Sequence, residues 1–389
     1  MEVFDRLCPT APGWHVDWPA ITAAFPWIRR LEGVPQDAVH HAEGDVAVHT
    51  RMAAEVLASL PEWRSRPPAD RVRLFAAVLL HDSAKPYCTE HQADGSITAH
   101  GHSRHGDLLA RRVLWELAAP TAWREHVAAL VRHHQVPFWG LERPLDDLRR
   151  IAYRVSLLAS NEDLAVLATA DILGRICSDA DEVLENIALY REFCAAEDCL
   201  TTPRAFPSDH ARFQFFRTPG RDPSYAAYDD TRTTVTVMSG LPGAGKDSWI
   251  AANRPGVAVV SLDAIRRELG IAPGAPQRAV AAAAQEAARV HLRRREPFVW
   301  NATNVSRQLR DQCTGLIAAY HGRVEIIALE APPAVLHRRN TDREHAVPRA
   351  AVDRMLRRWE TPDPTEGHTV LWVDTSREGR VTEAADTGV

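Results

Sequence analysis

A glycine-rich segment that ends in lysine has the residue types needed to bind nucleotide phosphates. Residues 240–246 read Gly-Leu-Pro-Gly-Ala-Gly-Lys, and they follow an expected strand and precede an expected helix. In that setting, backbone N–H groups and the helix N-terminus surround the phosphates while the lysine reaches the terminal ones. We predict an ATP-binding loop formed by Gly240, Gly243, Ala244, Gly245, Lys246, Asp247 and Ser248.

The residue after Lys246 departs from the usual P-loop pattern. A serine or threonine normally follows the lysine and binds Mg²⁺, whereas this chain has Asp247, with Ser248 one place later. A carboxylate can also bind Mg²⁺, but it adds negative charge beside the phosphates. The sequence leaves open whether Asp247 or Ser248 would bind the magnesium ion.

A second set of polar residues could bind and activate a phosphate acceptor. Asp263 stands at the end of an expected strand, and Arg266 follows three residues later. Asp263 would accept the proton of an attacking hydroxyl group, and Arg266 would bind an anionic part of the acceptor. Thr303 and Asn304, at the end of another expected strand, are further substrate-binding candidates. Helix capping and turn formation are the alternative roles of these side chains.

Basic side chains provide two further signals. Arg339 and Arg343 lie in the sequence His-Arg-Arg-Asn-Thr-Asp-Arg (337–343) and could close over a transferring phosphoryl group, although such a segment can also be a solvated helix end. Among 46 lysines and arginines, only Lys85 and Lys246 are lysines. A compact ammonium group cannot be exchanged freely for a planar guanidinium group in a phosphate site. We therefore predict that both lysines contact phosphate.

In the first half of the chain, the order of His49, the adjacent His81 and Asp82, and Asp171 resembles that of the metal-dependent phosphohydrolases of the HD superfamily. The expected metal ligands are His49, His81, Asp82, His102, His134 and Asp171. Mixed imidazole and carboxylate ligands suit one or two ions of manganese, iron, nickel or cobalt, which would activate a water molecule for attack on phosphorus. Lys85 and Arg175 would bind the substrate phosphate. His105 and His133 are close enough in sequence to exchange roles with His102 and His134.

The elements that must position these residues differ between the two halves of the chain. Residues 1–199 show apolar spacings of three and four, which predict an all-α domain. Residues 200–232 are rich in proline, glycine and aromatic residues and indicate an ordered connector. Residues 233–389 alternate between strand and helix patterns, which predicts an α/β domain with a parallel sheet. Its strands are expected at 233–239, 257–262, 298–302, 323–329 and 369–373.

Composition indicates a soluble cytoplasmic protein of more than one domain. The chain has 389 residues, of which 45% are hydrophobic and 25% charged. No signal-peptide pattern and no apolar run of transmembrane length is present, so no membrane association is expected. The six cysteines are scattered without a CxxC pair and are expected to be reduced thiols.

The motifs of the second half together resemble the 5′-hydroxyl polynucleotide kinases. In this resemblance Lys246 matches the P-loop lysine, Asp263 the general base and Arg266 the ligand of the acceptor phosphate. Arg339 and Arg343 match the two arginines of the lid. The family's Asp-Thr-Asn segment is altered, because alanine stands at its aspartate position, 302. A carboxylate missing there and one gained at 247 suggest that a magnesium ligand has been relocated.

An HD domain ahead of such a kinase resembles the HD-Pnk family of bacterial end-healing enzymes over nearly the whole chain. The resemblance implies ATP-dependent phosphorylation of 5′-OH ends of RNA or DNA and removal of 2′,3′-cyclic or terminal 2′/3′ phosphates, with a separate RNA ligase as functional partner. Two alternatives remain open. One is a small-metabolite kinase fused to an HD nucleotide phosphohydrolase. The other is a regulatory ATPase that controls an HD hydrolase.

Overall fold

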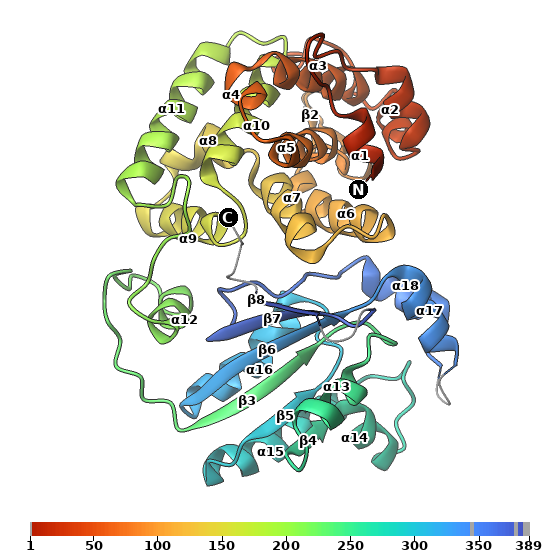
Figure 1. The fold of residues 1–389 in the computed structure, drawn as a ribbon, viewed down its shortest axis with the longest axis vertical. Helices are drawn as coiled ribbons and strands as arrows, with labels where there is room; N and C mark the ends of the chain where they lie inside the picture. Colours follow the sequence, from red (N-terminus) through yellow and green to blue (C-terminus); the bar gives the residue numbers. More distant parts are fainter. Residues whose placement is uncertain (1, 343–345, 377–379, 384–389) are drawn as a thin grey trace. The chain divides into compact units, whose positions relative to one another are not determined.

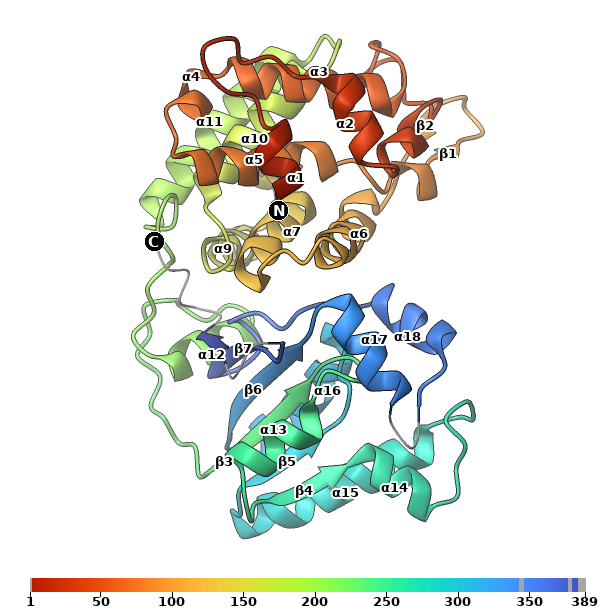
Figure 2. The same cartoon turned by 45° about the vertical axis from the view of Figure 1, so that its right-hand side comes forward.

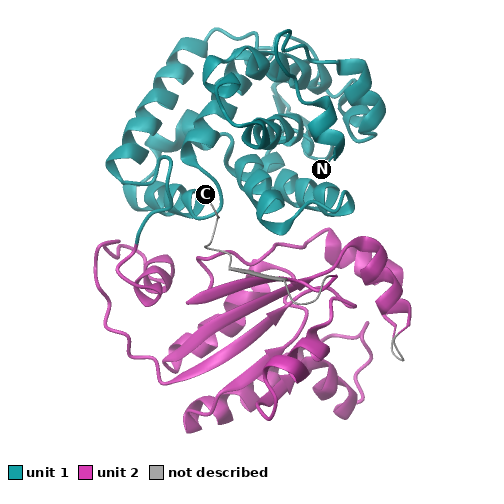
Figure 3. Cartoon of the chain, viewed as in Figure 1, with its two compact units in different colours: residues 1–205 teal, residues 206–389 magenta. Residues whose placement is uncertain are grey.

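The computed structural model describes residues 2–342, 346–376 and 380–383, and it divides the chain into two compact units, Met1–Ala205 and Phe206–Val389. Unit 1 contains the expected metal ligands, and unit 2 contains the glycine-rich loop and the expected acceptor-binding residues. Figure 3 shows the two units in different colours. No helix among the described residues is both long enough and apolar enough to cross a membrane.

Unit 1 is helical, as the sequence predicted (Figure 1). A short antiparallel hairpin interrupts the helices, formed by β1 (Glu90–His91) and β2 (Ile97–Thr98), and the sequence pattern had not indicated it. Here η denotes a 3₁₀ helix. The helical elements are α1 (Glu2–Leu7), α2 (Trp18–Ala24), η1 (Ile28–Leu31), α3 (Val46–Ser59), α4 (Pro61–Arg64), α5 (Pro68–Leu80), η2 (Lys85–Tyr87), α6 (His102–Glu116), α7 (Thr121–His133), α8 (Val136–Trp139), η3 (Gly140–Glu142), α9 (Leu145–Ser156), α10 (Asn161–Leu173) and α11 (Ala180–Ala196).

Helix α10 forms the centre of unit 1. Ser160 caps its N-terminus by accepting a hydrogen bond from the backbone N–H of Asp163. Its residues are apolar on nearly all sides, so the helix is buried against α3, α5 and α11 instead of presenting one face to solvent. This burial carries Asp171, an acidic residue in the last turn of α10, into the interior of the unit.

Unit 2 is built on a six-stranded sheet in the order β4-β5-β3-β6-β7-β8. The first five strands are parallel, as predicted, and β8 pairs antiparallel with β7 at one edge. The strand β8 was not predicted from the sequence. The strands are β3 (Thr233–Ser239), β4 (Ala258–Ser261), β5 (Phe298–Asn301), β6 (Gly322–Glu330), β7 (Thr369–Asp374) and β8 (Arg380–Glu383).

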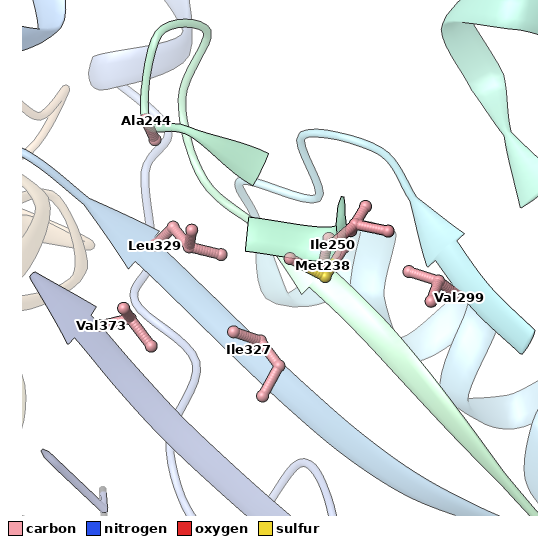
Figure 4. Close-up of a cluster of buried hydrophobic side chains, with 7 residues drawn as sticks. All are labelled: Met238, Ala244, Ile250, Val299, Ile327, Leu329 and Val373. Atoms are coloured by element: carbon pink, nitrogen blue, oxygen red, sulfur yellow. The ribbon is translucent and has the colours of Figure 1, made fainter. Parts of the chain in front are cut away.

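Helices cover both faces of this sheet, and Figure 1 shows α13 in front of it and α16 behind it. The helices of unit 2 are α12 (Asp209–Arg217), α13 (Lys246–Asn253), α14 (Leu262–Glu268), α15 (Arg278–Arg294), α16 (Arg307–Ala319), α17 (Pro333–Thr341) and α18 (Arg349–Leu356). Figure 4 shows the apolar cluster that joins α13 and the glycine-rich loop to the strands, formed by Met238, Ala244, Ile250, Val299, Ile327, Leu329 and Val373. Burial of this cluster anchors the loop that begins α13.

Part of the segment expected to be a connector forms a helix of unit 2. Helix α12 is capped by Ser208 and packs against the segment that leads into β7. The Arg212 guanidinium donates to the carbonyl oxygens of Pro364 (3.1 Å) and His368 (2.8 Å). His210 Nδ1 lies 3.0 Å from His368 Nε2, and both imidazoles are buried. These contacts make residues 209–217 a structural part of the α/β unit.

Candidate active sites

Five helices of unit 1 bring the six expected metal ligands together. His49 lies on α3, His81 and Asp82 directly follow α5, and His102 begins α6. His134 directly follows α7, and Asp171 lies in the last turn of α10. All six side chains are buried. Residues from 49 to 171 thus converge because the ends of α5, α6 and α7 meet α3 and α10 in the interior.

The six side chains form two adjacent groups, each with ligand atoms within 4.8 Å of one another. In the first group, His49 Nε2 lies 3.2 Å from His81 Nε2 and 3.2 Å from Asp171 Oδ1. In the second group, His102 Nε2 lies 3.3 Å from His134 Nε2. This pairing fits two metal ions better than one.

Asp82 faces both groups. Its Oδ2 lies 3.2 Å from His81 Nε2 in the first group. Its Oδ1 lies 3.3 Å from His102 Nε2 and 3.9 Å from His134 Nε2 in the second. A carboxylate that offers one oxygen to each group is placed to bridge two cations.

Backbone carbonyl groups orient the imidazoles. Nδ1 of His81, His102 and His134 lies 2.7 to 2.8 Å from the carbonyl oxygen three residues earlier. A carbonyl oxygen can only accept a hydrogen bond, so each Nδ1 carries a proton and each Nε2 points toward the cluster. Nδ1 of His49 instead lies 3.1 Å from Glu43 Oε1 and 3.3 Å from the Gly174 carbonyl oxygen.

His134 and Asp82 have protonation states that suit a divalent cation, and two carboxylate oxygens of the cluster have open valences. Burial lowers the pKa of His134 to about 3, which keeps this imidazole neutral. Burial would raise the pKa of Asp82, but the neighbouring His81 and Lys85 outweigh it and hold the pKa well below its usual range. Asp82 Oδ1 and Asp171 Oδ2 are buried without a hydrogen-bond donor among the described residues. Because unsatisfied buried oxygens are costly, these residues fit a metal centre.

Lys85 and Arg175 reach the same centre. Lys85 Nζ lies 2.7 Å from Asp82 Oδ2 and donates to Gln36 Oε1 at 2.7 Å. The Arg175 guanidinium donates twice to Asp171 Oδ1, at 2.7 and 2.9 Å. Both cations therefore stand beside the carboxylates of the cluster.

The structure also distinguishes between histidines that the sequence could not separate. His102 and His134 face the cluster, whereas His105 Nδ1 lies 3.3 Å from Cys88 Sγ, and His133 belongs to neither group of ligands. The sequence had given no sign that Gln36 contacts Lys85. Glu43 Oε1 lies 3.1 Å from His49 Nδ1, so this carboxylate orients the His49 imidazole.

In unit 2, the glycine-rich loop has a backbone conformation that depends on glycine. Gly240, Gly243 and Gly245 have φ angles of 153°, 86° and 94°. A Cβ atom on Gly240 would lie 2.5 Å from the Leu329 carbonyl oxygen, so the loop passes very close to the end of β6. The Lys246 ammonium group donates to the carbonyl oxygens of Gly240 (2.8 Å) and Leu241 (3.1 Å), and thus folds back over the loop.

The carboxyl ends of β4, β5 and β3 meet at one edge of the sheet, because these strands are adjacent and parallel. This edge brings together the loop after β3, Asn301 at the end of β5 and Asp263 just after β4. Asp247, in the first turn of α13, accepts a hydrogen bond of 2.7 Å from Asn301 Nδ2. Its carboxylate therefore lies beside Asn301, the residue before Ala302, where the aspartate of the polynucleotide kinase pattern is missing. Both Asp247 and Ser248 are exposed.

Asp263 and Arg266 form an ion pair on the first turns of α14. The Arg266 guanidinium also donates to Gln277 Oε1 at 2.8 Å, a contact that the sequence had not suggested. The Asp263 side chain is 64% exposed, so an acceptor could reach it.

Thr303 and Asn304 hold the loop after β5 against β3. The Thr303 carbonyl accepts from the Gly240 N–H (2.8 Å), and the buried Asn304 amide donates to the Met238 carbonyl (2.8 Å). Arg310, which is buried and paired with Glu366, donates to the Asn304 carbonyl at 2.9 Å. The Asn304 side chain thus links the loop after β5 to β3. This contact differs from the substrate contact expected for it.

Arg339 lies next to the glycine-rich loop. Its guanidinium donates to the Thr375 hydroxyl (2.8 Å) and carbonyl (2.9 Å), and a Cβ on Gly245 would lie 3.8 Å from its Nη1. Thr375 Oγ1 in turn donates to the Ala244 carbonyl. Arg343, the second arginine expected to close over the phosphoryl group, lies outside the described residues.

Comparisons with known proteins agree with the architecture. Residues 45–185 match the family described as HD domain, and residues 235–362 match the family described as AAA domain. The chain is therefore a helical HD domain followed by a P-loop kinase-like domain with a parallel sheet. Such domains bind divalent metal ions and ATP with Mg²⁺, respectively.

Several individual proteins are similar to parts of this chain. The Multifunctional CCA protein of Halorhodospira halophila is 33% identical over 123 residues, which is 32% of this chain and 27% of that protein. The protein of the same name from Azoarcus sp. is 29% identical over 164 residues, 41% of this chain and 37% of its own length. The chain thus spans about a quarter to a third of these relatives. A sugar kinase from Janibacter sp. matches 37% of this chain and 87% of its own, with a TM-score of 0.30 and 20% identity.

Proposed function

We propose that this chain is a bifunctional nucleic-acid end-healing enzyme. The kinase unit would phosphorylate 5′-OH ends of RNA or DNA with ATP. The HD unit would remove 2′,3′-cyclic or terminal 2′/3′ phosphates, leaving ends that a separate ligase can join. The main support for the proposal is that one chain contains both sites. In the HD unit, Asp82 faces both groups of candidate metal ligands, and in the kinase unit the Asp263–Arg266 ion pair lies at the same end of the sheet as the P-loop.

In the HD unit, the side chains around the cluster suit phosphate-ester hydrolysis. His49, His81, Asp171 and the bridging Asp82 would bind one divalent metal ion, and Asp82, His102 and His134 a second. Bound there, the metal would lower the pKa of a water molecule and polarise the phosphate. Lys85 and Arg175 would bind the phosphate oxygens and balance the charge that develops on them.

In the kinase unit, the P-loop amides and Lys246 would hold the ATP phosphates while Asp263 activates the acceptor. Arg266 would leave Asp263 and bind the phosphate on the 3′ side of the acceptor nucleotide. The freed carboxylate would take the proton from the 5′-OH while the 5′ oxygen of the acceptor forms its bond to the γ-phosphorus. The bond to the β–γ bridging oxygen then breaks, and ADP leaves. Arg339 would stabilise the charge on the transferring group.

The proposed function is tested by supplying the purified chain with γ-labelled ATP and 5′-OH oligonucleotides, and in parallel with oligonucleotides that end in a 2′,3′-cyclic phosphate. Label transfer to the 5′ end and metal-dependent loss of the cyclic phosphate are expected. Saturation by mononucleosides without label on oligonucleotides would instead indicate a metabolite kinase. ATP turnover with no labelled acceptor would indicate a regulatory ATPase.

Substitution of Arg266 by alanine is expected to reduce phosphorylation of a nucleoside 3′-monophosphate by tens- to hundreds-fold. Loss of a charge-assisted pair in a desolvated site costs on the order of 2–4 kcal/mol. An unphosphorylated nucleoside is expected to be a poor acceptor for the native chain. Initial rates with the two acceptors measure the effect, and equal turnover of both by the native chain would contradict the assignment.

Substitution of Asp247 by alanine is expected to remove most of the kinase activity, because its carboxylate lies at the edge where Mg²⁺ would sit. Ser248→Ala is expected to be mild. Asp247→Ser should recover part of the activity with a changed Mg²⁺ dependence, since it rebuilds the usual motif. Mg²⁺ titrations of the initial rate distinguish the three variants. A normal rate and Mg²⁺ response in Asp247→Ala would refute the relocated magnesium ligand.

A further inference from the structure

The segment that follows β6 carries a concentration of exposed arginines. Residues 333–358 contain seven arginines and three acidic residues, a net charge of +4, within a chain whose net charge is −5. Five of these arginines are exposed on or next to α17 and α18 and are called the arginine surface here: Arg338, Arg349, Arg354, Arg357 and Arg358. Figures 1 and 2 both draw α17 and α18 side by side.

No acidic side chain in residues 2–342, 346–376 and 380–383 pairs with these guanidinium groups. None of the five makes a side-chain hydrogen bond or an ion pair with another residue in the described ranges, although Asp342 and Asp353 lie in the same segment. In contrast, Arg289 and Arg293 on α15 both pair with Glu286. The arginine surface therefore keeps its full positive charge for a partner.

Helix α18 has one side committed to the protein and another available to a ligand. Val352, Leu356 and Trp359 are buried. Arg354 lies on α18, Arg357 caps its C-terminus and Arg358 follows directly, and all three are exposed. The anchored end of α18 thus presents three cations within five residues.

The arginine surface adjoins the phosphate-binding loop through α17. A Cβ atom on Gly243 would lie 2.6 Å from the Leu336 carbonyl oxygen, so α17 rests directly on the loop. Arg339, the neighbour of Arg338, reaches Thr375 and the loop itself. Arg338 is therefore one residue away from a guanidinium group that lies at the phosphate-binding loop.

We propose that the arginine surface binds the phosphodiester backbone of a polynucleotide acceptor beyond its first nucleotide. This inference rests on the proposed kinase function and adds where the rest of the strand lies. ATP is too short to occupy five separated guanidinium groups in addition to the loop. A single-stranded nucleic acid carries one phosphate per nucleotide and matches both the sign and the repetition of the charge.

The test compares a long and a short acceptor in one triple variant, Arg354→Gln/Arg357→Gln/Arg358→Gln. The KM for a 5′-OH RNA of about 20 nucleotides is expected to rise by roughly 10- to 100-fold at about 0.1 M salt, and the slope of log KM against log salt to fall by about 2. The kinetic constants for a nucleoside 3′-monophosphate are expected to stay unchanged, because that acceptor does not reach the surface.

A matched control is Arg289→Gln/Arg293→Gln/Arg294→Gln on α15, which removes the same charge from another helix of this unit and should change neither acceptor. An unchanged KM for the RNA in the first variant would overturn the proposal, as would an equal loss with both acceptors. If the native chain phosphorylates neither acceptor, the proposed function itself fails. If the native chain phosphorylates both acceptors but the triple variant has the same kinetic constants, only the proposed role of the arginine surface is refuted.

Discussion

Replacement of Asp82 by alanine is expected to abolish phosphohydrolase activity and to remove the bound metal from the HD unit, with the kinase activity unchanged. Asp82 faces both groups of ligands, with Oδ1 3.3 Å from His102 Nε2 and Oδ2 3.2 Å from His81 Nε2. Without it, neither group has its full set of ligands and the bridging negative charge is lost. Because a metal ion can shift the pKa of water from 15.7 to about 7, loss of the centre should slow hydrolysis by at least about 10³-fold.

Metal analysis separates this effect from a simple loss of activity. The native chain, loaded with Mn²⁺, Ni²⁺, Co²⁺ or Fe²⁺, is expected to bind up to two ions, and chelation should lower its melting temperature. The Asp82→Ala variant should bind little metal and show no shift on chelation. His105→Ala is the matched control, because His105 contacts Cys88 instead of the cluster. Full phosphohydrolase activity in metal-loaded Asp82→Ala would show that the assigned ligands are wrong.

Replacement of Lys246 by alanine is expected to reduce 5′ phosphorylation by about 10²- to 10³-fold or more, and to leave 3′-end processing intact. Its ammonium group folds over the P-loop carbonyls of Gly240 and Leu241. ATP would draw it onto the terminal phosphates, where it balances the charge of the transferring group. Lys246→Arg should also be impaired, because a planar guanidinium group does not fit where a compact ammonium group does.

The role of Lys246 in ATP binding can also be checked without a kinase assay, by measuring how ATP changes the melting temperature. Saturating ATP with Mg²⁺ should raise the melting temperature of the native chain, since a ligand that binds only the folded state stabilises it. That shift should be smaller in Lys246→Ala, whereas Asp82→Ala should keep it in full. Substantial 5′ phosphorylation by Lys246→Ala would mean that another cation performs this role.

Local sequence patterns predicted much of the fold. The strand at 233–239 has the bounds that the sequence indicated, and the glycine-rich loop follows it directly, because strand, loop and helix are consecutive in the chain. The edge strand β8 and the hairpin of β1 and β2 were missed. The two strands of the hairpin have two residues each, which is too short for an alternating pattern to stand out. Helix α12 was also missed, because the proline and glycine residues on either side of it indicated a connector.

The amino-acid sequence by itself determined which chemistry each half could perform. It supplied the P-loop lysine, the Asp-x-x-Arg pair and the ordered series of histidines and aspartates, all of which depend on residue type and short spacing. Only the tertiary structure decided which imidazoles gather. His102 and His105 are three residues apart on one helix, yet only His102 faces Asp82, because helix packing turns one side of α6 inward. It also decided that Asp82 offers one oxygen to each group, that Asp247 meets Asn301, and that Asn304 is buried beneath the loop. The cluster contact between His49 and Asp171 joins residues 122 positions apart (171 minus 49), and the geometry of all these contacts follows from how helices and strands pack.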